Sequence, residues 1–169
     1  MMKSILKLMT ATFLAIAPMN AVAQSNVAHI NVQQLISEMP EVIAAQNELS
    51  KLEKDYTTQI DNAFKEFQTK AQSYSSDAAN QTDVTNQARQ KELESMQTNL
   101  QEFRDSAAQE LQKKQMDLMT PLLEKARDAI TKVGKEQGFN YVIDSSPNGG
   151  IILADGKDLI EDVKKALGF

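Results

Sequence analysis

Residues able to do chemistry are few in this sequence, and their spacing does not gather them into a site. His29 is the single histidine and the chain has no cysteine, so a thiolate metal site and a cysteine nucleophile are both excluded. A lone histidine without cysteine could hold a transition metal only with several carboxylates, and we interpret His29 as an ordinary strand residue. We therefore predict no catalytic residue, no metal site and no cofactor.

Two short motifs resemble known functional motifs, but neither is strong evidence for a function. The stretch from Asp155 to Asp158 reads DGKD, which lacks the alternating acids and terminal glutamate of a calcium loop. We interpret it as a turn, with Asp158 capping a last helix that runs to Leu167. The triplet from Asn80 to Thr82 matches a glycosylation acceptor, a three-residue pattern that carries little weight without knowledge of the host.

The N-terminal residues 1–23 have the pattern of a secretory signal peptide. Lys3 and Lys7 precede a short apolar run, and an Ala-Val-Ala cleavage site stands before Gln24. The apolar run is too short to span a bilayer as a permanent helix, although an uncleaved anchor is the alternative. We expect a secreted, soluble mature protein that begins at Gln24.

The mature chain is acidic, and this argues against two classes of partner. Without Lys3 and Lys7 it has 16 basic and 23 acidic residues, a net charge of −7. Phosphate backbones require a basic surface, so we do not expect nucleic acid as the main partner. The sequence also lacks a polybasic patch for anionic lipid.

A long helical excursion interrupts a small β body. Apolar residues recur in an 11-residue repeat from Leu49 to Tyr74, and a second stripe runs from Leu93 to Val133. Stripes this narrow must pack on each other, which predicts an antiparallel coiled-coil hairpin with arms of comparable length, about fifty residues each. Pro121 interrupts the second arm, where we expect a bend and not a stop.

The sequence thus predicts a mostly α protein of the α+β class, with three regions after the signal. Residues 24–40 and 138–169 form the β body, and residues 41–137 form the helical hairpin. Its tip lies in the polar, turn-prone stretch 73–86, expected to be loosely ordered, with the second helix starting at Asn86 or Gln87. In the body, Phe139–Asp144 and Ile151–Ala154 are predicted to pair as a β-hairpin around a turn at 147–150.

The order of these features resembles the Skp/OmpH family of periplasmic chaperones for outer-membrane proteins. The resemblance extends over essentially all of the mature chain. It is most specific in the return helix with Pro121, in the Gly138-Phe139 entry to a strand, and in the terminal DLIEDVKKAL.

Family membership would imply a homotrimer whose three helical hairpins hang like tentacles from a shared β body. Their cavity would hold unfolded outer-membrane β-barrel proteins in the periplasm without ATP. A body this small is also expected to oligomerise on grounds of size. The corresponding body residues are Ile30, Val32, Tyr141, Val142, Ile143, Ile151 and Leu153.

Client contacts are expected at apolar residues off the main stripes, namely Phe64, Met116 and Met119, for which packing between the helices is an equal alternative. The best-known family members are basic, whereas this mature chain is acidic, which argues against carrying over lipid or lipopolysaccharide binding. A secreted coiled-coil spacer or tether is the competing interpretation. It shares the arms but does not explain the return to a strand body.

Overall fold

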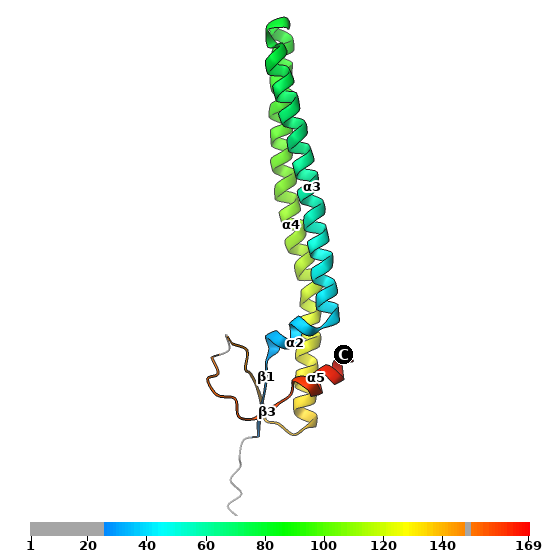
Figure 1. The fold of residues 1–169 in the computed structure, drawn as a ribbon, viewed down its shortest axis with the longest axis vertical. Helices are drawn as coiled ribbons and strands as arrows, with labels where there is room; N and C mark the ends of the chain where they lie inside the picture. Colours follow the sequence, from blue (N-terminus) through cyan, green and yellow to red (C-terminus); the bar gives the residue numbers. More distant parts are fainter. Residues whose placement is uncertain (1–25, 148–149) are drawn as a thin grey trace, which may run out of the picture.

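The computed structural model describes residues 26–147 and 150–169 and shows a long helical hairpin on a small body (Figure 1). The predicted α+β class is confirmed. The predicted signal peptide lies outside the described residues, as do Asn148 and Gly149 of the predicted turn. None of the helices in the described ranges is long and apolar enough to cross a membrane.

The body is organised around strand β1 (Val27–Ile30) at the centre of a three-stranded sheet. Strand β2 (Tyr141–Asp144) lies on one side and the two-residue β3 (Lys157–Asp158) on the other, and both run parallel to β1. Parallel neighbours need a crossover connection, and here the entire helical hairpin is the crossover between β1 and β2.

Three helices precede the return to the body. Helix α2 (Val32–Glu38) begins after Asn31, whose side chain accepts a hydrogen bond from the Gln34 N–H. Helix α3 (Pro40–Asp77) starts with a proline in its first turn, where the missing N–H is no loss. Helix α4 (Asp83–Glu136) follows the 3-10 turn η1 (Ala78–Asn80) and closes the hairpin.

Burial along the hairpin follows the predicted stripes. Every stripe residue of α3 from Val42 to Tyr74 is buried or half-buried, and so is every stripe residue of α4 from Leu93 to Val133. Near mid-length, Tyr56 meets Phe103 edge-to-face, with ring centroids 6.1 Å apart. Helix α4 continues through Pro121, as predicted.

The two arms are unequal, contrary to the expectation. Helix α3 has 38 residues, about 57 Å of helix, whereas α4 has 54. Helix α3 begins at Pro40, next to the predicted start, and α4 is longer because its last turns run under the sheet as part of the body.

The hairpin tip is tighter than expected. The turn occupies only residues 78–82, and the polar stretch around it is helical and not loosely ordered. The second helix starts at Asp83 because the Thr82 side chain accepts a hydrogen bond from the Thr85 N–H, 3.2 Å away. Asp77 and Arg89 also form an ion pair across the turn, with 3.0 Å between the carboxylate oxygen and the guanidinium nitrogen.

The core of the body joins segments from both ends of the chain. Its largest fully buried side chains come from β1, α2, the start of α3, and the residues that begin or form the last helix α5 (Ile160–Leu167): Ile30, Leu35, Met39, Val42, Leu159 and Val163. Asp158 accepts a hydrogen bond from the Ile160 N–H at 2.9 Å, but the N-cap residue of α5 is Leu159, so the predicted cap position is wrong by one residue.

The predicted β-hairpin is wrong. Tyr141–Asp144 pairs with β1, and Ile151–Ala154 belongs to no strand. Ser146 donates its N–H to the Asp144 carboxylate over 2.9 Å, which turns the chain away from β2. The third strand is Lys157–Asp158, a polar pair without the apolar pattern by which strands are recognised.

Gly134 provides a test of how closely α4 approaches the sheet. A Cβ at this position would lie 2.7 Å from Cγ2 of Val142 on β2. We therefore expect Gly134→Ala to lower the free energy of unfolding by about 1–3 kcal/mol despite the better helix propensity of alanine. Chemical denaturation would measure this loss. Adding Val142→Ala should restore part of the lost free energy of unfolding. If the effects of the two substitutions simply add, the contact between Gly134 and Val142 is contradicted.

Candidate functional site

His29, the one residue with catalytic potential singled out in the sequence, has a structural environment. Its Nδ1 lies 3.3 Å from the Ser145 hydroxyl and its Nε2 lies 3.0 Å from the Gly156 carbonyl. The ring thus links the segment after β2 and the segment before β3 to the central strand. Within residues 26–147 and 150–169, no cluster of three or more acids and histidines could hold a metal ion.

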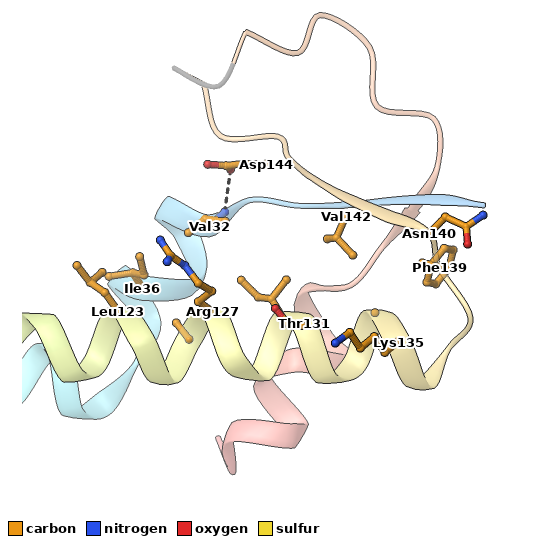
Figure 2. Close-up of a pocket in the computed structure, with 13 residues that line it drawn as sticks. Val32, Ile36, Leu123, Arg127, Thr131, Lys135, Phe139, Asn140, Val142 and Asp144 are labelled. Carbon is orange, nitrogen blue, oxygen red and sulfur yellow. Dashed lines mark hydrogen bonds between the residues drawn. The ribbon is translucent and has the colours of Figure 1, made fainter. Parts of the chain in front are cut away.

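A groove lies beside the body (Figure 2). It has a volume of about 570 Å³ and lies between α2, the last turns of α4, and β2. Val32, Ile36 and Leu123 supply apolar walls, while Arg127 and Lys135 stand along α4. In Figure 2, Val142 points from β2 toward α4 and closes the groove from above.

Asp144 organises the end of this groove. One of its carboxylate oxygens accepts hydrogen bonds from the Val32 N–H at 3.2 Å and from the Ser146 N–H and hydroxyl at 2.9 and 2.5 Å. Partial burial alone would raise the pKa of Asp144, but these hydrogen bonds outweigh it and hold that pKa below its usual range. The charged carboxylate therefore fixes α2 against the end of β2.

Exposed apolar residues are found on β2 and in the segment that follows it. Tyr141 and Ile143 alternate with the inward-facing Val142 on the edge strand β2, and both are exposed. Ile152 and Leu153 in the following segment are almost fully exposed, at 102% and 82%. We call Tyr141, Ile143, Ile151, Ile152 and Leu153 the body patch. A patch of this kind marks an interaction surface.

The residues predicted for the oligomer body divide between this patch and the interior. Tyr141, Ile143, Ile151 and Leu153 are exposed. Ile30 is buried in the core of its own chain, and the half-buried Val32 and Val142 pack against that core. Ile152 was not singled out in the sequence, although the uninterrupted apolar run from Ile151 to Leu153 contained the signal.

The three predicted contact residues of the hairpin also differ in their surroundings. Phe64 and Met116 are exposed, at 38% and 54%, whereas Met119 packs against the core of the body. Sequence reasoning missed Ile43 and Leu123, which are exposed at 46% and 44%. Each directly follows a residue of the apolar stripe, and this position beside the stripe was the signal available.

The hairpin has two chemically different sides. On each helix, the residues just before and just after a stripe residue point about 100° to either side of it. Because the helices are antiparallel, the preceding residues of both helices share one side and the following residues share the other. The first side contains the cross-hairpin bonds Glu41–Lys125, Glu48–Lys114, Tyr56–Glu110 and Lys70–Glu92.

These bonds pair charged residues on the first side, and they affect the pKa of Glu92. The Lys70 ammonium, 2.5 Å away, and then the Tyr74 hydroxyl, 2.6 Å away, lower the pKa of Glu92. A shallow hollow on this side is lined largely by charged residues, including Glu48, Lys51 and Asp117. We call this side the ionic flank.

The opposite side is different in composition. Its shallow hollow is lined by Phe64, Phe67, Leu100, Gln97, Thr98, Gln101 and Arg104. Phe64 and Phe67 stack with centroids 6.5 Å apart. The residues that follow the stripe are rich in glutamine: Gln46, Gln68, Gln72, Gln97, Gln101 and Gln112. We call this side the glutamine flank.

Comparison with known proteins places the chain in a family. The family model described as "Outer membrane protein (OmpH-like)" matches residues 26–167. The chain belongs to the OmpH-like family. The match includes the body and the hairpin together, so the likeness does not rest on the helical arms alone.

Two OmpH-like relatives agree with this assignment. The chain is 27% identical over 158 residues to a protein of Yersinia enterocolitica named chaperone protein Skp, with 90% of this chain and 92% of that protein aligned. A solved structure from Caulobacter crescentus, described as a candidate OmpH-like outer membrane chaperone, superposes with a TM-score of 0.76. At 12% identity, over 86% of this chain and 85% of that one, this second likeness shows the fold. Family membership supports a chaperone role for the chain.

The role of Asp144 predicts a defined pH dependence. A depressed pKa in the folded state stabilises the fold at pH values above the unfolded-state pKa, and this contribution is lost as the pH falls through the folded-state value. We expect Asp144→Asn to be less stable than the parent chain near pH 7 by about 1 kcal/mol. The difference should shrink below about pH 4, as followed by urea denaturation at fixed protein concentration. A difference independent of pH would show that charge is not involved.

Proposed function

We propose that this protein is an ATP-independent holdase chaperone that keeps unfolded outer-membrane β-barrel proteins from aggregating. The observation that carries the proposal is the family match over both the body and the hairpin. A long hairpin fixed to a body at one end offers a large side surface to a polypeptide. We propose that residues 1–23 direct the chain to the periplasm as a cleaved signal.

The described surface suits a client that is weakly hydrophobic along its whole length. Strands of a β-barrel alternate apolar and polar residues, so an unfolded barrel offers many small apolar contacts and no large one. The hairpin has apolar side chains spaced along it, among them Ile43, Phe64, Met116 and Leu123. Many weak contacts spread over a long arm could retain such a chain while allowing its release. We propose Phe64 and Met116 among the contact residues.

Light scattering tests the holdase proposal directly. Mature protein from Gln24 onward is mixed with a urea-unfolded outer-membrane β-barrel, and the urea is diluted without nucleotide. We expect suppressed scattering and a soluble complex of defined mass. A client that aggregates as fast as in buffer alone would favour the coiled-coil spacer instead.

We further propose that the body is an oligomerisation module and that the active form is a homotrimer. The described body is small, and domains of this size bury little apolar surface by themselves. Strand β2 is an edge of the sheet, so its outer backbone groups are free to pair with another chain. The body patch lies beside this edge and would be covered in the assembly.

Charge in the body patch tests the assembly. Ile152→Asp with Leu153→Asp should convert the trimer to monomer at micromolar concentration, because carboxylates would be buried in an apolar interface. Mass photometry or sedimentation would measure the mass. Val84→Asp, an equally exposed apolar position near the tip, is the matched control and should leave the mass unchanged. Unchanged mass in both variants would remove the body patch from the interface.

A further inference from the structure

We infer that the glutamine flank is the surface on which the hairpin holds an unfolded polypeptide, and that the ionic flank faces away from it. This inference rests on the proposed holdase function and specifies the surface and the chemistry of binding. The occupant is an extended chain segment of low net charge with unpaired backbone amides.

The first argument concerns charge along the two flanks. On α3, the residues that precede the stripe include six charged ones: Glu41, Glu48, Lys51, Asp55, Glu66 and Lys70. Those that follow the stripe include only Glu53 and Asp61. Desolvating a charge is costly unless it is paired, so a polypeptide lies at lower cost on the flank with fewer charges.

The second argument concerns the charges already used by the hairpin. Apart from Asp77–Arg89 at the tip, each cross-hairpin ion pair or Tyr–Glu bond lies on the ionic flank or at the stripe: Glu41–Lys125, Glu48–Lys114, Tyr56–Glu110, Lys70–Glu92 and Tyr74–Glu92. These bonds join the two helices, and a client competing for them would separate the arms. The ionic flank thus holds the two arms together, and the glutamine flank is left to bind a client.

The third argument is the match between glutamine and an unfolded backbone. A glutamine side chain has both an amide N–H donor and a carbonyl acceptor, as does each peptide group. It can therefore bond to a backbone of any sequence. Gln97 and Gln101 lie in one hollow with Phe64, so a hydrogen-bonding pair stands beside an aromatic face. This combination suits a strand that alternates polar and apolar residues.

The fourth argument is continuity with the body. The residues that follow the stripe on α4 continue from Gln101 past Gln112 to Leu123 and Arg127, which line the groove of Figure 2. Gln46 of α3 borders a second hollow on the body, shared with Val32 and Ile36. The glutamine flank and the groove thus form one track from mid-hairpin to the body.

A matched pair of variants separates the two flanks. Variant one combines Gln97→Glu, Gln101→Glu and Gln112→Glu on the glutamine flank. Variant two adds the same charge to the same helix on the ionic flank, by Ser95→Glu, Asn99→Glu and Ser106→Glu. All six positions are exposed. Circular dichroism melts would first establish that both variants fold like the parent chain.

Binding of a fluorescently labelled, urea-unfolded outer-membrane β-barrel would then be titrated. We expect variant one to raise the dissociation constant about tenfold and variant two less than about twofold. Replacing the same three glutamines with lysine should also weaken binding. Equal effects of the two variants, or tighter binding with lysine, would overturn the inference. Absence of binding to the parent chain would instead refute the holdase function itself.

A second readout does not depend on charge. The chain has no cysteine, so Gln101→Cys and Asn99→Cys each give one attachment point for a benzophenone crosslinker. The two positions lie two residues apart on opposite flanks of α4. We expect crosslinks to client mainly from Gln101→Cys, whereas equal yields would contradict a sided surface.

Discussion

Parallel pairing of β1 with both β2 and β3 is the constraint on which the rest of the structure depends. The central strand forms its hydrogen bonds with segments more than a hundred residues away, so the hairpin must return to the point where it began. That return places the end of α4 beneath the sheet and sets α5 against it. The base of the hairpin is therefore fixed in direction, while the remainder projects beyond the body.

The hairpin itself was largely predictable because its determinants are local. A stripe residue such as Leu52 or Phe103 is recognised from its spacing to neighbours three or four positions away, and burial follows that spacing in the structure. The tip was less predictable, since its tight turn depends on individual bonds made by Thr82 and Asp77. Polar composition alone does not distinguish a capped helix end from a loose loop.

The body was harder to predict because strand pairing is decided between distant segments. Ile151–Ala154 looks more like a strand than Lys157–Asp158, yet the polar pair lies beside β1. The apolar segment is exposed instead, and we propose that it lies in an interface between subunits. The two flanks of the hairpin were also not predicted from the sequence. The spacing identifies the residues on either side of each stripe, but which of them share a flank depends on how the two helices pair.

The short turn at the tip has a consequence for how the chain reaches this structure. Contacts between the arms span 12 residues at Asp77–Arg89, 22 at Lys70–Glu92, 54 at Tyr56–Glu110 and 84 at Glu41–Lys125. Because closing a longer loop costs more entropy, we expect the contacts between the arms to form from the tip toward the base, and the sheet to form last. Strand β1 would then pair with β2 and β3 only after almost all of the chain between them has folded.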